Sequence, residues 1–415
     1  MHSRAREHAV PIAAAALALV MVGWLALYGW ALTDYDFEVR PAFDALVQGH
    51  LLRFLELAPA YGGSLVIRAP FVLATKLWRG GELSIYRAAA APCLAASAVL
   101  GVWLVARMRV LGHTRLARAV ALALCVANPL TLPALEIGHP EELLGAVLCV
   151  AAVVVASRNR SIWAGVLLGL AIANKEWALI AVGPVAIALP EHRMRCLLTA
   201  GAVAAVVLAP LAAAGGFVTE VRGAATEAPI IFNPWQVWWF FGGHLHTLRV
   251  AGHIVPGHRW DHRVEPAWVG TISHPLIVAV TAPMTLLCVR MRSRGASRPG
   301  HEALLLLTLA LLLRCMLDPW DISYYALPFL LSLLVWETLT FVRPPVLALG
   351  AAFAGWFVLQ WAVPGHGFSP DEQSLLFLAL TLPSAIALGV ALYAPGLGRR
   401  LAPRIGDRAA VPAHA

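Results

Sequence analysis

The chain has 415 residues, of which 60% are hydrophobic and only 13% are charged, and its formal net charge is +8 at pH 7. A soluble globular domain carries about 25% charged residues. A single water-exposed core cannot hide this much apolar surface, so the composition excludes an ordinary soluble protein. It predicts an all-α polytopic membrane protein.

The arginines predict how the chain is oriented. They gather in short segments between apolar runs, at 4–6, 107–118, 158–160, 193–195, 290–298 and 399–408. Placing these segments together on the cytoplasmic side satisfies the positive-inside rule, and the acidic residues then fall mainly in the outer segments. The basic charge is thus interpreted as an orientation signal, with both termini cytoplasmic in a plasma membrane and with no nucleic-acid partner.

Twelve apolar runs are expected to form transmembrane helices, at 9–32, 83–106, 117–135, 141–157, 161–174, 176–190, 196–214, 272–289, 303–317, 322–341, 344–363 and 374–394. The first run is over twenty residues long and ends without a small-x-small cleavage site, which favours a retained signal anchor. A further stretch at 65–78 contains two basic residues and a mid-run proline, and is predicted to be an interfacial helix on the outer face.

Two of the twelve runs are unusually short. At ~1.5 Å per residue, helices at 161–174 and 176–190 would each cover roughly 21 Å of a ~30 Å hydrocarbon core. They are expected to form a shallow hairpin with its tip at 174–177, beneath the outer surface.

The domain organisation follows from these runs. One transmembrane domain is expected at 1–395, with long outer loops at 33–82 and 215–271, followed by a basic cytoplasmic tail at 396–415. No internal repeat is visible by eye. The six cysteines are scattered in apolar runs without a CxxC pair, so they are interpreted as packing residues.

Three acidic residues follow the first apolar run. Asp34, Asp36 and Glu38 are spaced at i, i+2 and i+4, which in an extended segment places all three side chains on one face. A carboxylate that loses part of its hydration at a membrane boundary can act as a general base. The alternative is a solvated polar exit from the membrane.

This segment resembles a motif of membrane glycosyltransferases of the GT-C fold. The string Asp36-Phe37-Glu38-Val39-Arg40, with Gln48-Gly49 after it, is similar to the first outer loop of actinobacterial polyprenyl-phosphate-mannose-dependent mannosyltransferases. The stretch at 63–71 resembles their membrane-hugging segment, and Arg40 departs from the family's usual aromatic residue. The resemblance implies a GT-C-like fold with Asp36 as catalytic base. Asp34, from the same set of three acids, is the second candidate.

A second polar segment is the string at 136–142, predicted to lie between two helices on the outer side. Glu141 and Glu142 fall in the first turn of a helix, where its dipole stabilises carboxylates, and this is a sufficient structural reason for them. The family resemblance implies a binding role for His139 and Glu142.

Two cations are predicted to lie within the membrane. Lys175 is one of only two lysines, the other being Lys76, and Arg314 lies about one turn inside a predicted boundary. Intramembrane ionisable groups are candidates for function, and both cations could neutralise a donor phosphate together with His139. The alternatives are structural ion pairs with a nearby acid, Asp318 in the case of Arg314.

Aromatic residues are the remaining candidates for substrate binding. Tyr324 and Tyr325 are expected to line a cavity, and similar Tyr-Tyr-x-Leu-Pro strings occur in the family. Trp235 in the second outer loop is a candidate for stacking on a sugar, although tryptophan also favours membrane interfaces without any such role. The histidines of this loop match no ordinary metal-site spacing, so neither a metal nor another cofactor is expected.

These observations together predict an inverting hexosyltransferase. It would move a sugar, mannose by the resemblance, from a polyprenyl-phosphate donor to a lipid or glycan acceptor of the cell envelope on the outer face. The main alternative is a transporter or flippase for a lipid-linked or small solute, and a silent scaffold is a third possibility.

Overall fold

A computed structural model describes residues 9–21, 34–219, 221, 232–244, 261–292 and 299–394, and the short segments 246–247, 249–250 and 253–254. The regular secondary structure of the described residues is helical apart from four two-residue strands, which pair β1 with β4 and β2 with β3 in antiparallel fashion. These strands are His246–Thr247, Arg249–Val250, His253–Ile254 and Asp261–His262. The predicted all-α class is confirmed.

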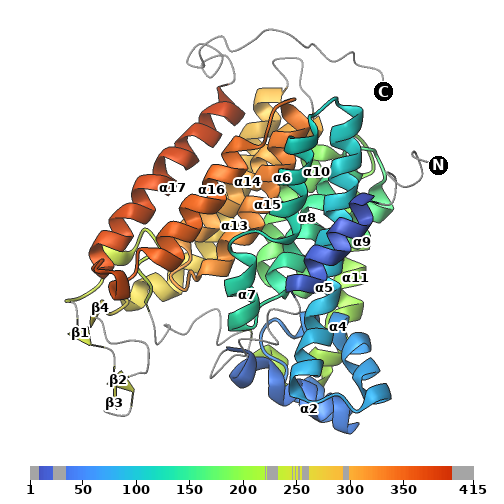
Figure 1. Cartoon of the computed structure of the whole chain (residues 1–415), viewed down its shortest axis with the longest axis vertical. Helices are drawn as coiled ribbons and strands as arrows, with labels where there is room; N and C mark the ends of the chain where they lie inside the picture. The colour runs from blue at the N-terminus through green and yellow to red at the C-terminus, as the bar shows by residue number, and fades with distance from the viewer. Residues whose placement is uncertain are drawn as a thin grey trace.

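The helices of the first half of the chain follow one another with short connections (Figure 1). They begin with an unlabelled helix at Ala9–Met21. The others are η1 (Tyr35–Val39), α2 (Arg40–Gln48), α3 (Leu51–Glu56), α4 (Gly62–Ala74), η2 (Thr75–Trp78), α5 (Glu82–Val110), α6 (Arg115–Val126), α7 (Thr131–Ile137), α8 (Glu141–Ala156), α9 (Ser161–Asn174), η3 (Glu176–Ala181), α10 (Val182–Ala188) and α11 (Arg193–Ala214).

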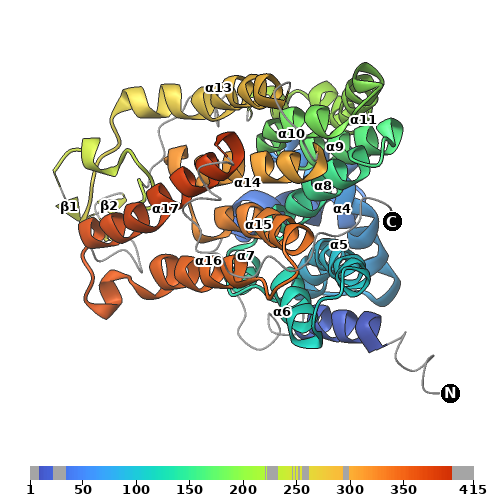
Figure 2. The same cartoon turned by 90° about the horizontal axis from the view of Figure 1, so that it is seen from above.

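The second half adds a further group of helices, which extends to one side of the first when the molecule is seen from above (Figure 2). Its members are η4 (Trp239–Phe241), α13 (Ala267–Arg292), α14 (Pro299–Leu317), η5 (Ser323–Tyr325), α15 (Ala326–Thr340), α16 (Val346–Trp356), η6 (Phe357–Trp361), η7 (Pro364–His366) and α17 (Pro370–Tyr393).

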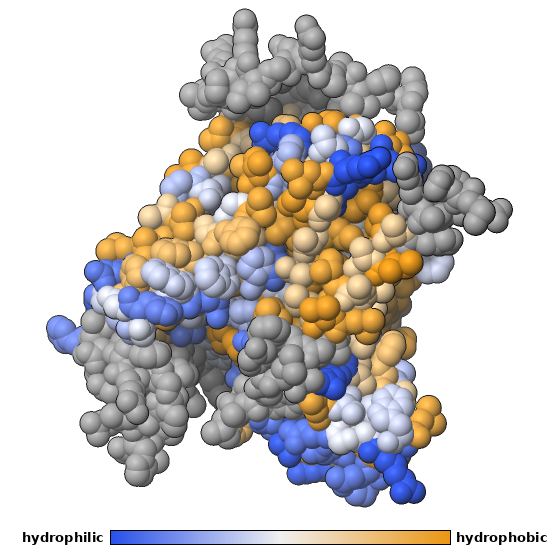
Figure 3. Space-filling model, in the orientation of Figure 1, coloured by the Kyte–Doolittle hydropathy of each residue, from blue (hydrophilic) through white to orange (hydrophobic). Residues whose placement is uncertain are grey.

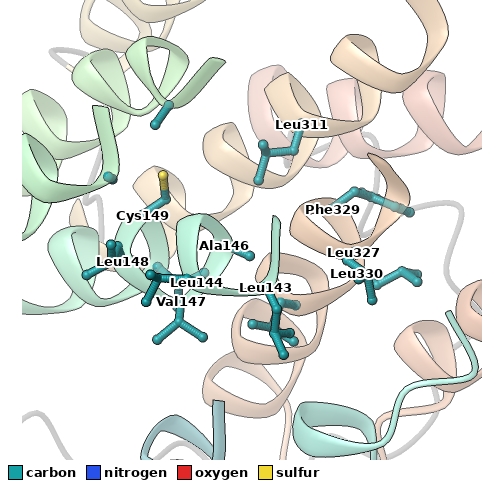
Figure 4. Packing of buried hydrophobic residues seen from close by; sticks show 14 of the residues in the cluster. Leu143, Leu144, Ala146, Val147, Leu148, Cys149, Leu311, Leu327, Phe329 and Leu330 are labelled. Carbon is teal, nitrogen blue, oxygen red and sulfur yellow. The ribbon is translucent and has the colours of Figure 1, made fainter. Parts of the chain in front are cut away.

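Helix α8 is the centre of the bundle. After Glu141 and Glu142 its sequence is apolar on every side, as expected of a helix that is surrounded by other helices. It packs against α5, α9, α14 and α15. Figure 4 shows apolar side chains of α8 beside Leu311 of α14 and Leu327 of α15. The two glutamates of its first turn are therefore carried into the interior.

Helices α9 and α11 approach each other closely through two glycines. Gly165 and Gly169 lie four residues apart, on one face of α9. A Cβ atom at either glycine would lie only 2.5 Å from a backbone carbonyl oxygen of α11, that of Cys196 or that of Ala200. Such small-xxx-small spacing permits close helix packing in membranes. The contact positions α9 against α11, and the last residue of α9, Asn174, immediately precedes Lys175.

Among the described residues, six helical segments are long and apolar enough to cross a bilayer, at Glu82–Val110, Arg115–Ile137, Arg193–Ala214, Ala267–Met291, Pro299–Leu317 and Pro370–Tyr393. The second of these comprises α6, a short break and α7. The most apolar windows of α11, α13 and α17 are only 22%, 22% and 17% buried within the protein, so these helices present apolar surface outward. Figure 3 shows apolar side chains across the middle of one face and polar ones at both ends. This distribution supports membrane character.

The predicted count of twelve spans is not established by these helices. Helices α8, α9 and α15 have 16, 14 and 15 residues, so they reach about 21–24 Å at ~1.5 Å per residue. The run at 117–135 is interrupted between α6 and α7, and that at 176–190 is divided between η3 and α10. Only 9–21 of the first run is described, and the tail at 396–415 lies outside the described residues.

The predicted outer loop at 33–82 and the arginine-rich turn at 107–118 lie at opposite ends of the molecule. In Figure 1, α2 and the four strands occupy the lower end, whereas α5 leads up to its turn into α6. The stretch at 65–78, predicted to be an interfacial helix, is helical as α4 and η2, and α4 packs against α2, α5, α9 and α11. This arrangement agrees with the sidedness that the arginines predict.

Cysteine labelling of intact cells tests that sidedness. Arg53→Cys on α3 should react with a membrane-impermeant maleimide, whereas Arg115→Cys should react only after the cells are permeabilised. Background reaction should be low because all six native cysteines are buried. Labelling of position 115 in intact cells, with position 53 protected, would reverse the predicted orientation.

Candidate functional site

The site is built on the turn between α7 and α8. Gly138 ends α7 with φ of 112°, a left-handed conformation that glycine adopts without strain. A Cβ atom here would lie 2.7 Å from the backbone nitrogen of Tyr35, so the first loop packs directly against this turn. His139 and Pro140 follow, and α8 then begins with Glu141 and Glu142, whose charges its dipole stabilises.

Glu141 is fully buried and has three basic partners from different parts of the chain. Its Oε2 lies 3.3 Å from Nη2 of Arg68 on α4, at an angle that does not make a hydrogen bond. Its Oε1 lies 2.6 Å from Nδ1 of His139 and 3.5 Å from Nζ of Lys175. The side-chain amide of Asn174 also donates to the backbone oxygen of Glu141, at 2.9 Å.

Glu142 is likewise fully buried, and it faces the other side of the cluster. Arg314 of α14 donates two hydrogen bonds to its carboxylate, at 3.2 and 3.3 Å. The indole N–H of Trp177 donates a third at 3.2 Å, and Nζ of Lys175 lies 3.4 Å away. Lys175 thus bridges the two glutamates. We refer to Arg68, His139, Glu141, Glu142, Lys175 and Arg314 together as the buried charge cluster.

Aromatic rings surround its cations. The Arg314 guanidinium lies over the rings of Trp177 and Tyr325, 4.6 and 4.2 Å from their centroids. Such contacts stabilise a cation that has lost its water. The ring of Tyr324 lies 4.4 Å from that of His139. Both tyrosines that the sequence singled out therefore contact the cluster.

Tyr61 joins the cluster to the first loop. Nζ of Lys175 lies 4.0 Å from the centroid of its ring, and its hydroxyl donates to Glu38 Oε2 at 2.5 Å. Burial, and then the charge of Glu38, raise the pKa of Tyr61 well above its usual value. Tyr61 therefore stays protonated and acts as a donor.

The acids of the first loop do not share one face, contrary to the expectation for an extended segment. Residues 35–39 are helical, so Asp34 and Glu38, four apart, face the cluster, whereas Asp36 lies on another side. Asp34 Oδ2 is 3.1 Å from Nε2 of His139. Asp36 pairs with Arg40 at 3.3 Å. The structure thus brings Asp34, and not the motif residue Asp36, to His139.

Trp235 lies outside the buried charge cluster. It is half-buried, packs against the main hydrophobic core, and its indole N–H is buried without a hydrogen-bond partner. Among the described residues, no group of three histidine, cysteine, aspartate or glutamate side chains is placed to hold a metal ion. Six histidines occur between positions 244 and 274. Of these, His258 lies outside the described residues, as do the side chains of His246, His253 and His262.

Sequence reasoning assigned no site role to Arg68, Tyr61 or Trp177. Arg68 is 1% exposed, within the apolar stretch of α4. The rule that identified Lys175, an isolated charge in an apolar run, applies equally to Arg68. The predicted ion-pair alternative for Lys175 and Arg314 is observed, and the partner of Arg314 is Glu142 and not Asp318.

The cluster carries more positive groups than negative ones. Burial alone lowers the pKa of His139, but Glu141 and Asp34 outweigh it and raise this pKa to about 9, so the imidazole is charged at neutral pH. Four positive groups then lie within ion-pair distance of three carboxylates, those of Glu141, Glu142 and the partly exposed Asp34. Further carboxylates act from outside the cluster: the exposed Glu38 and Glu176 on Lys175, and the buried Asp318 on Arg314. Among the groups in direct contact, positive charge is in excess and can accommodate an anion.

The raised pKa of His139 predicts a pH-dependent stability. A group whose pKa is higher in the folded state stabilises the protein fully below its unfolded pKa, near 6.5, and loses this effect as pH rises through about 9. The loss should be roughly 3 kcal/mol. His139→Gln should remove this dependence in thermal unfolding between pH 6 and 10, while His50→Gln, at an exposed position, should keep it. Parallel pH curves for His139→Gln and wild type would contradict the assignment.

Comparison of the chain with protein-family models, with characterised proteins and with solved structures finds no match.

Proposed function

We propose that the protein transfers a sugar, mannose by the resemblance of its first loop, from a polyprenyl-phosphate donor to a lipid or glycan acceptor of the cell envelope. The reaction would take place on the outer face of the plasma membrane. The observation that carries the proposal is the excess of positive charge in the buried cluster, next to the partly exposed carboxylate of Asp34. The resemblance to GT-C glycosyltransferases supports the same reaction class.

A phosphate is the anion that suits this cluster. Burying an unbalanced cation costs several kcal/mol, and a phosphate oxygen supplies the missing negative charge. Arginine presents paired N–H groups to phosphate, and lysine presents a compact charge. Arg68, Lys175 and Arg314 would share their donors between the glutamates and the phosphate. A donor on a polyprenyl carrier explains why such a site belongs to a membrane protein.

The reaction would be a single displacement. Asp34 accepts the proton of an acceptor hydroxyl, whose oxygen forms a bond to the anomeric carbon of the donor sugar. The bond from that carbon to the phosphate oxygen breaks, and its electron pair leaves with polyprenyl phosphate. Attack from the opposite side inverts the configuration. Lys175 and Arg314 stabilise the charge that develops on the leaving phosphate.

Donor binding tests the proposal, and the chain offers a matched control because it has only two lysines. Lys175→Met should weaken binding of polyprenyl-phosphate mannose by about tenfold to a hundredfold, the usual value of a hydrogen bond to a charged group. Lys76→Met, at an exposed position of η2, should not change it. Binding is measured with purified protein in lipid nanodiscs.

Two results would count against the proposal. Normal donor binding by Lys175→Met would place the phosphate elsewhere. Movement of the donor lipid across proteoliposomes, without transfer to any acceptor, would favour the transporter or flippase alternative, which uses the same buried cations but has no need of Asp34 as a base.

A further inference from the structure

A second polar group lies beside the buried charge cluster, where three segments of the outer end meet. Nε2 of His274 on α13 lies 3.5 Å from Asp318 Oδ1, and the backbone N–H of Trp320 donates to the same oxygen at 3.0 Å. The rings of His274 and Trp320 are in edge contact, with centroids 5.2 Å apart. Asn233, in the segment 232–241 that also contains Trp235, Trp238 and Trp239, donates to the backbone oxygen of Asp321 at 3.0 Å.

Several side-chain atoms in this region are buried and have no hydrogen-bond partner among the described residues. The acceptors are both carboxylate oxygens of Glu265 and Oδ1 of Asp321, and the donors are the indole N–H groups of Trp235 and Trp320. Glu265 and Asp321 are only 8% and 1% exposed. Buried polar atoms that are left unpaired are destabilising. Their concentration in one region requires an explanation.

The mixture of donors and acceptors indicates what kind of ligand fits. A metal cation would suit the carboxylates but would be repelled by the indole N–H groups. A phosphate would accept from the N–H groups but would leave the carboxyl oxygens without donors. A hydroxyl group both donates and accepts, so a ligand with several hydroxyl groups can satisfy the whole set. Tryptophan rings beside such groups also offer faces for sugar rings.

The pKa values of Glu265 and Asp321 also favour a ligand with hydroxyl groups. Burial raises the pKa of Glu265 to about 7, with His274 opposing and Asp318 adding to the shift. Burial, together with repulsion from Asp318, raises the pKa of Asp321 well above its usual range. A carboxyl group that is protonated near neutral pH can also donate a hydrogen bond to a hydroxyl oxygen.

This group is adjacent to the proposed donor site. Asp318 directly follows α14, and its backbone N–H donates to the carbonyl oxygen of Arg314 at 2.9 Å. Arg314 also contacts Tyr325, just beyond Asp321 in the chain. A ligand held here would therefore lie next to a phosphate held by Arg314.

We infer that Glu265, Asp321, Trp320 and Trp235 form a subsite for the hydroxyl groups of a sugar-containing acceptor. This inference rests on the proposed glycosyl transfer, since it assigns the acceptor to the region beside the donor phosphate. It commits the acceptor to a carbohydrate, in place of a simple lipid alcohol.

Binding of α-linked mannotriose to wild-type protein in nanodiscs, followed by saturation-transfer NMR, tests the subsite without any need for catalysis. Trp320→Phe keeps an aromatic ring but removes one N–H, and Glu265→Gln removes one carboxylate. Each should weaken mannotriose binding by about tenfold, the value of one hydrogen bond, and leave donor binding unchanged. Trp163→Phe, 63% exposed on α9, is the matched control and should behave as wild type.

The inference is overturned if wild type does not bind mannotriose, or if both variants bind it as tightly as wild type. It is also overturned if manganese ions, and not mannotriose, bind in a way that Glu265→Gln abolishes. Mannotriose binding with the expected losses, in a protein that shows no donor binding, would support the subsite and refute the proposed transfer. Donor binding without mannotriose binding would support the proposed transfer and refute the subsite.

Discussion

Replacing Asp34 with asparagine should lower sugar transfer by about 10²–10⁴-fold, the usual contribution of a general base. Asparagine keeps the size of the side chain and an oxygen that can accept from His139, but it cannot take a proton. Asp34 is 38% exposed, so an acceptor can reach it, and its removal should leave folding and donor binding intact. Transfer rates and donor affinity of the purified variant provide the measurement.

The control for this experiment is Asp36→Asn, at the position that the family motif favours. Asp36 pairs with Arg40, which is itself 2.8 Å from Glu82, so its loss should have a smaller effect than that of Asp34. If transfer falls for Asp36→Asn alone, the motif identifies the base correctly, and Asp36 replaces Asp34 as the general base in the mechanism. If both variants are fully active with a confirmed donor and acceptor, general-base catalysis from this loop is refuted.

Removing Arg314 should be among the most destabilising single changes in the protein. Arg314→Met leaves the fully buried Glu142 with only Lys175 and Trp177 among its observed partners. Breaking a buried ion pair from one side costs about 3–5 kcal/mol of unfolding free energy. Arg53→Met, which breaks an exposed pair with Glu56, should cost no more than about 1 kcal/mol. Unfolding in detergent, monitored by tryptophan fluorescence, provides both values.

A double variant separates the structural role of Arg314 from phosphate binding. Arg314→Met combined with Glu142→Gln removes both charges, and uncharged replacements of a buried pair are often neutral in stability. The double variant should therefore recover most of the lost stability and still bind polyprenyl-phosphate mannose weakly. If it regains donor binding together with stability, Arg314 serves the fold alone.

The sequence by itself determined the membrane character and most of the helices. Hydropathy and charge are local properties, so an apolar run predicts a helix without knowledge of its neighbours, as for α5, α9, α11 and α14. An isolated charge inside such a run is also visible locally, because lipid offers it no water. This is why Lys175 and Arg314 could be identified as site candidates.

Only the tertiary structure decided which of these charges meet. Glu142 and Arg314 are separated by 172 residues, and no local pattern relates them. The choice between Asp34 and Asp36 depended on backbone conformation. An extended segment directs residues two apart to the same face, whereas a helix directs them to different faces. Arg68 joined the site only because the fold brings its side chain, on α4, within 3.3 Å of Glu141 at the start of α8. Pairing is long-range, and hydropathy does not encode it.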